Sequence, residues 1–206
     1  LLELRQDGAL VTGCYDRTGE LSGAVDGSML YATGVDRKDG VPSAFVLTVA
    51  PDGALNGLRS TNGAPFRHYS ADPAPKGTDT ACSEPAHAAL GCGSIVYGIR
   101  FGYDSAVIRP ESAQILDQLY AGLQAAPGVS IVIEGHTSSE GSEAYNQDLA
   151  ERRARAVVEA MVERGLDSGR IAAAGRGEDE PIASNDDEAG RSLNRRVEVE
   201  CAAAEA

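Results

Sequence analysis

The stretch "IEGHTSSEGSEAYNQDLAERRARAVV" (Ile133–Val158) decides the fold of the second half of this 206-residue chain. A β-branched run ends in a small polar loop, and an apolar stripe with helical spacing then begins. Ser142 is a suitable N-cap and Gly165 a suitable C-terminal glycine, so we predict a helix over 143–164. The residues expected on its core side are Tyr145, Leu149, Ala156, Val157, Ala160 and Met161.

Strands alternate with helices on both sides of this stretch. A second helix is predicted over 110–124, with Ile115, Leu116, Leu119 and Leu123 on one face. The predicted strands are 94–103 ("SIVYGIRFGY"), 129–135 ("VSIVIEG"), 170–175 ("RIAAAG") and 195–201 ("RRVEVEC"). A polar loop is expected before the last strand. The order β-α-β-α-β-β predicts an α+β sandwich, with two helices over one face of a mixed sheet.

The first third of the chain has another pattern. Gly or Asp-Gly recurs every few residues from 1 to 69, between short apolar-polar alternations that are typical of hairpins. We predict an all-β antiparallel meander, forming a small curved sheet. Residues 70–91 are rich in Pro and Ala and are predicted to be a linker before a domain over 92–206.

The composition limits the classes of partner and location. With a net charge of −13, the chain lacks the basic surface that a nucleic acid requires. The sequence contains no signal peptide and no apolar segment of membrane length, so we expect no transmembrane segment. The start, "LLELRQDG", looks like that of a mature or excised fragment, which leaves the mode of anchoring open.

Four cysteines allow two sensible pairings. One is a local Cys82–Cys92 bridge, and the other joins Cys92 to Cys201 and Cys14 to Cys82. Either pairing indicates an oxidising compartment, whereas four free thiols are the third alternative. Because no C-x-x-C spacing or nearby histidine pair occurs, no zinc site is expected. The acidic loop "GEDEPIASNDDEAG" lacks calcium-loop spacing, so we predict no metal and no cofactor.

Four motifs follow one another in the order of a known family. They are "FGYDSAVIRPESAQIL", the opening stretch extended to Leu166, "RIAAAGRGEDEPIASN" and "GRSLNRRVEVE". Residues from about 95 to 201 resemble the OmpA-like peptidoglycan-binding domain, which outer-membrane proteins, peptidoglycan-associated lipoproteins and flagellar stator proteins share. The first 69 residues resemble β-meander modules that precede envelope domains, but only in the regular alternation of short strands and glycines.

The resemblance implies non-catalytic binding of the peptidoglycan peptide stem, chiefly its diaminopimelate, in the bacterial periplasm. Such a domain links the outer membrane to the cell wall. In the family, an aspartate directly after the Gly-His-Thr threonine binds the ligand ammonium, and an arginine fifteen residues later binds its carboxylate. These positions are Ser138 and Arg153 here. Alternatively, Arg153 forms an ion pair with Glu151 or with a carboxylate of the loop.

Ser138 is a departure from the family pattern. A neutral hydroxyl forms a hydrogen bond of ~1 kcal/mol, against ~1.5–3 kcal/mol for a charged partner. We therefore expect a loss of affinity of about tenfold or more, unless Glu140 or Asp104 supplies the charge. Asn146 is expected to bond either the loop backbone or the ligand, and Arg196 either lines the site or forms a cross-strand salt bridge with Glu198. The predicted ligand-binding set is Arg153, Ser138, Thr137, Asp104, Asn146, Leu149 and Arg196.

Three other functions were compared with wall binding. A hydrolase would need His136 with Ser138 or Ser139, but no oxyanion motif such as G-x-S-x-G accompanies them, so we predict no enzyme. The serious alternative is the same fold with an altered ligand, in which the Ser138 loop accepts another carboxylate compound or a protein. In the third alternative function, the β-meander domain binds a protein partner and the second domain anchors it to the cell wall.

Overall fold

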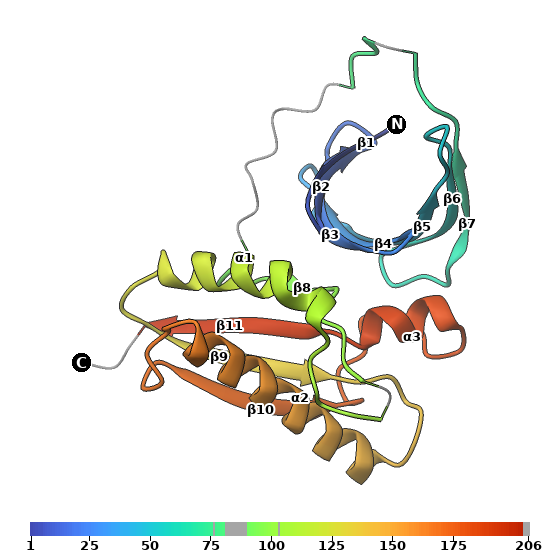
Figure 1. Ribbon diagram of the computed structural model, residues 1–206. Helices are drawn as coiled ribbons and strands as arrows, with labels where there is room; N and C mark the ends of the chain where they lie inside the picture. Colours follow the sequence, from blue (N-terminus) through green and yellow to red (C-terminus); the bar gives the residue numbers. More distant parts are fainter. Residues whose placement is uncertain (76, 81–89, 103, 204–206) are drawn as a thin grey trace. The chain divides into compact units, whose positions relative to one another are not determined.

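The computed structural model describes residues 1–75, 77–80, 90–102 and 104–203. The chain divides into two compact units, Leu1–Ala88 and Ala89–Ala206 (Figure 1). None of the described helices combines the length and the apolar character needed to cross a membrane.

The first unit is a seven-stranded antiparallel sheet whose strands pair in sequence order. Viewed along the strands, the sheet is bent into an open arch (Figure 1). Glycines with positive φ form the tight turns, for example Gly8 (60°) between β1 and β2 and Gly27 (62°) between β3 and β4. The predicted meander is therefore confirmed. Its strands are β1 (Leu2–Asp7), β2 (Leu10–Tyr15), β3 (Gly19–Asp26), β4 (Met29–Asp36), β5 (Pro42–Val49), β6 (Leu55–Thr61) and β7 (Arg67–Ala71).

An aromatic cluster forms the core of this sheet. The rings of Tyr15 and Phe45 meet edge to face, with centroids 5.2 Å apart. The guanidinium carbon of Arg59 lies 4.9 Å from the Tyr15 centroid, and an Arg59 nitrogen lies 2.7 Å from Asp16. The buried residues packed around them are Val11, Leu21, Leu30, Ala32 and Leu47. These contacts stabilise the first unit, and none of them indicates a binding site.

The second unit contains a four-stranded mixed sheet in the order β10-β9-β11-β8. β9 and β10 are parallel, whereas β11 is antiparallel to β9 and β8. The α+β prediction is therefore confirmed. Its elements are β8 (Ile95–Val96), the 3-10 helix η1 (Pro110–Ser112), α1 (Ala113–Gln124), β9 (Val129–His136), α2 (Glu143–Glu163), β10 (Ile171–Gly177), α3 (Glu188–Asn194) and β11 (Val197–Ala203).

Two predictions for this unit are wrong. The strand predicted over 94–103 is reduced to two residues, because the chain then turns away: Arg100 N–H donates to the Ser112 hydroxyl, 2.8 Å away, and Phe101 bridges to Ile108. The loop predicted before the last strand contains α3. The apolar face predicted for the first helix is confirmed, since all four residues named for it are buried in α1.

One face of the sheet is apolar and lies under α2. A Cβ at Gly135 would come 2.3 Å from the Ala150 carbonyl oxygen, so glycine is required for the close approach of β9 to α2. Ile131 and Ile133 share this face of β9, opposite Cys201 and Val199 of β11. The other face carries charged side chains from the alternate positions, namely Glu134, Glu198 and Glu200.

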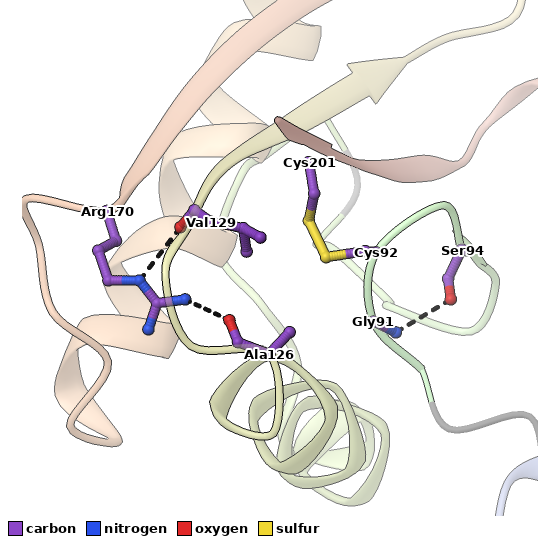
Figure 2. The surroundings of a disulfide bond; sticks show 7 residues. All are labelled: Gly91, Cys92, Ser94, Ala126, Val129, Arg170 and Cys201. Carbon is purple, nitrogen blue, oxygen red and sulfur yellow. Dashed lines mark hydrogen bonds between the residues drawn. A yellow bond between two sulfur atoms is a disulfide. The ribbon is translucent and has the colours of Figure 1, made fainter. Parts of the chain in front are cut away.

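A disulfide joins the two ends of this unit. Cys92, before β8, is bonded to Cys201 in β11, with Cα atoms 5.3 Å apart (Figure 2). Gly93 N–H donates to the Val199 carbonyl oxygen, 2.7 Å away, which holds the same segment against β11. This bond excludes the Cys82–Cys92 pairing and the four free thiols. Cys82 lies outside the described residues, so its pairing with Cys14 stays a prediction.

Candidate ligand-binding site

Arg153, on α2, is held by the turn that precedes η1. Its Nε donates to the carbonyl oxygen of Ser105, 3.2 Å away, and its guanidinium carbon lies 4.9 Å from the centroid of the Phe101 ring. In the described part of the chain no carboxylate lies within ion-pair distance of Arg153. Glu151, the predicted alternative partner, binds Arg155 instead. A backbone carbonyl and an aromatic face thus position the guanidinium, which has no ion-pair contact among the described residues.

The electrostatic setting of Arg153 favours an incoming anion. Partial burial lowers the pKa of this guanidinium, and the positive charges of Arg195 and Arg152 lower the pKa further. Asp104 acts in the opposite direction. An arginine remains protonated in spite of such shifts, so a partly desolvated cation stays in place. An anion that binds it relieves both the desolvation and the repulsion by the neighbouring arginines.

Asp104 supplies a negative charge close to Arg153. It occupies the left-handed region with φ of 49°, and its carboxylate accepts a hydrogen bond from the Tyr145 hydroxyl. Tyr145 was predicted to lie in the core, and this is wrong: it is 39% exposed. The inward position at the start of α2 belongs to Asn146, which leaves the tyrosine on the outside to bind Asp104.

The Ser138 loop forms a second polar cluster. Ser138 is buried, and its hydroxyl donates to Glu140, with 3.2 Å between the oxygens. The same Glu140 oxygen lies 3.5 Å from an Arg195 nitrogen and 3.8 Å from Arg191. Both arginines also bind Glu188 on α3. Glu140 therefore brings a carboxylate beside the Ser138 position, but two arginines already neutralise it.

Three further predicted site residues lie inside the fold. Thr137 is buried, and its backbone N–H donates to the Gly177 carbonyl oxygen, 2.8 Å away. Asn146 is buried and donates to Glu178, a side-chain partner that the sequence analysis did not consider. Leu149 is part of the α2 core. These contacts lie on the buried side of the Ser138 loop and stabilise it.

The comparisons with known proteins concern the second unit. The OmpA family model matches residues 100–195. Residues 100–195 form an OmpA family domain. Outer membrane protein A of Bordetella avium is 44% identical over 100 residues, which are 48% of this chain and 52% of that protein. Peptidoglycan-binding protein ArfA of Mycobacterium bovis is 41% identical over 101 residues, which are 49% of this chain and 31% of that protein.

Among solved structures, the peptidoglycan-associated lipoprotein from Burkholderia pseudomallei is similar to this chain with 30% sequence identity and a TM-score of 0.46. The match covers 50% of this chain and 88% of that chain. This chain spans 52% of the Bordetella protein and 31% of the mycobacterial one.

In this OmpA family domain the two terminal arginines have separate surroundings. Arg196 is buried, with Nε 2.5 Å from Glu198 and Nη2 3.0 Å from the Glu180 carbonyl oxygen. These contacts favour the salt bridge with Glu198 over a ligand role, but the bridge is not cross-strand as predicted, because Glu198 lies only two residues further along the chain, in β11. Arg195 is the terminal arginine whose charge acts on Arg153. Arg195 and Phe101 were not among the predicted site residues, although both belong to the motifs quoted for the family.

His136 of the OmpA family domain is buried and makes no hydrogen bond to Ser138. It is 2% exposed, and burial, followed by the charge of Arg196, lowers its pKa to about 4. Within the described residues neither ring nitrogen has a hydrogen-bond partner, and the Ser138 hydroxyl donates to Glu140. A hydrolase pair requires a direct hydrogen bond between nucleophile and base. No such bond joins Ser138 to His136, so these two residues do not form a hydrolase pair.

Proposed function

We propose that the OmpA family domain binds the peptide stem of peptidoglycan, without catalysis, through the head group of diaminopimelate. The observation that carries this proposal is the partly buried Arg153, which has no carboxylate partner among the described residues and lies beside Asp104. The relation to ArfA, which is named a peptidoglycan-binding protein and is 41% identical over 101 residues, supports the choice of polymer.

The chemistry of the ligand fits the two charges. A free amino-acid head group carries an ammonium and a carboxylate on one carbon, so it requires an anion and a cation a few ångströms apart. The Arg153 guanidinium can bind the carboxylate through its remaining N–H groups, since only Nε is used by Ser105. Asp104, which Tyr145 orients, receives the ammonium. Asp104 thereby supplies one charged contact to the ammonium, while the second contact, which an aspartate at position 138 would add, is missing.

We place the chain in the periplasm, where the domain links the outer membrane to the cell wall. Two observations support this location. The Cys92–Cys201 disulfide is typical of an oxidising compartment. The Bordetella relative is named an outer membrane protein.

Sedimentation with purified sacculi tests the proposal. We expect the full chain to sediment with sacculi that contain diaminopimelate and to remain in the supernatant with sacculi that contain lysine in its place. Lysine lacks the carboxylate of the free head group and so removes the partner of Arg153. Equal sedimentation with both would favour the second candidate, an altered ligand, which the Ser138 departure supports. No sedimentation with either would contradict wall binding.

The substitution Ser138→Asp is expected to strengthen binding to diaminopimelate sacculi by about tenfold. A carboxylate at this position adds a charged contact to the ligand ammonium, in place of a neutral hydroxyl. Arg191 and Arg195, already within 3.8 Å of Glu140, offset the added repulsion by that residue. Ser139→Asp is the matched control, because it adds the same charge on the adjacent exposed residue. A gain of equal size in both variants would show a long-range charge effect and contradict a defined position.

A further inference from the structure

Three potential metal ligands meet on the sheet face opposite α2. Glu134 and His136 are two residues apart in β9, so their side chains project to the same face, and Glu180 follows β10 in the chain. One ligand atom from each of the three lies within 4.8 Å of the others. Glu134 and His136 are buried, while Glu180 is exposed. The cluster is thus partly enclosed, and Glu180 is its one exposed side chain.

The imidazole of His136 needs a partner that the described chain does not supply. Nδ1 and Nε2 both lack a hydrogen bond among the described residues, although the residue is 2% exposed. The carboxylate of Glu198 lies 3.8 Å from Nε2, which is too far for a hydrogen bond. Buried polar groups in folded proteins are almost always satisfied, so such a ring indicates a bound species.

We propose that Glu134, His136 and Glu180 form a binding site for a divalent transition-metal ion of the zinc type. One imidazole and two carboxylates are a donor set that such ions accept. Bonds of about 2.1 Å at tetrahedral angles place two donor atoms roughly 3.4 Å apart, so separations of up to 4.8 Å must shorten by as much as about 1.4 Å. Rotation of the exposed Glu180 side chain provides this movement.

The charges around the cluster favour a dication. Arg176 binds Glu134 through Oε1, which leaves the second carboxylate oxygen for a metal, and Arg196 binds Glu198. Glu180 and Glu200 also act on Arg176. With His136 neutral, four glutamates and two arginines leave a net charge of −2, which one divalent ion balances. No metal was predicted from the sequence, since it has no C-x-x-C spacing, no nearby histidine pair and no calcium-loop spacing; the present ligands come from a strand and a separate loop.

Equilibrium dialysis of the chelator-treated full chain against Zn²⁺ at pH 7 tests the site. We expect one zinc ion per chain, and at least a tenfold weaker affinity for Glu180→Gln, which replaces an exposed carboxylate by an amide of the same shape and keeps the fold. Asp179→Asn, the neighbouring exposed acid, is the matched control and should bind zinc as wild type does. The imidazole NMR signals of His136 should shift with zinc, and those of the exposed His68 should not.

Two outcomes would overturn the proposal. One is the absence of stoichiometric zinc binding. The other is an equal loss of affinity in Glu180→Gln and Asp179→Asn, which would show diffuse binding to the acidic surface. Because the cluster lies on the sheet face away from α2, neither outcome bears on wall binding through Arg153.

Discussion

Removal of the Cys92–Cys201 disulfide is expected to lower the free energy of unfolding of the second unit by about 4 kcal/mol. The bond joins residues 109 positions apart, so it closes a loop over most of that unit. Cross-linking a loop of about 100 residues reduces the entropy of the unfolded chain by an amount equivalent to roughly 4.7 kcal/mol. A loss of this size approaches the whole stability of an ordinary domain, ~5–15 kcal/mol.

Urea unfolding of Cys92→Ser/Cys201→Ser, followed by circular dichroism at 222 nm, measures this loss. The helices of the described chain all belong to the second unit, so their signal reports on that unit. Reduced wild-type protein is the control, and its helical transition should coincide with that of the double variant. Equal transition midpoints for the variant and the oxidised wild type would contradict the prediction.

Arg153→Ala is expected to weaken sedimentation with diaminopimelate sacculi by at least about 100-fold. Truncating one partner of a buried charged contact costs ~2–5 kcal/mol, and 100-fold corresponds to about 2.7 kcal/mol. The fold should survive, because the substitution removes one hydrogen bond to Ser105 and one cation–π interaction with Phe101, each worth ~1 kcal/mol.

Arg155→Ala is the matched control for this experiment. Arg155 lies on the same helix, is exposed and forms an ion pair with Glu151, so its removal changes the net charge equally. We expect its sedimentation to remain within about twofold of wild type, since exposed ion pairs contribute little. Unchanged sedimentation of Arg153→Ala would place the binding site elsewhere on the domain.

Local patterns were sufficient to predict most of the fold. The four apolar residues named for 110–124 are all buried in α1, and the Asp-Gly turns gave the antiparallel meander. α3 was missed because glycine at position 190 argues against a helix. The structure requires that glycine, since a Cβ there would lie 1.8 Å from the Ser184 carbonyl oxygen. A tertiary contact thus outweighs helix propensity, and no local pattern reveals it.

The site was harder to predict than the fold. The spacing from the Gly-His-Thr loop pointed to Arg153, whose role as a ligand contact stays a prediction. The choice between Arg195 and Arg196 depends on backbone register at the start of β11, where adjacent side chains point to opposite faces. The role of Phe101 depends on a turn that brings residues about fifty positions apart into contact. Such contacts depend on tertiary packing, which the periodicity and spacing of the sequence do not predict.

An NMR titration of the full chain with a diaminopimelate-containing stem peptide tests the central claim most directly. The Nε–H signal of each arginine reports on its own guanidinium. We expect a saturable shift of the Arg153 signal, strongly reduced in Asp104→Asn, with the Arg155 signal unchanged. A peptide that binds while the Arg153 signal stays constant would contradict it.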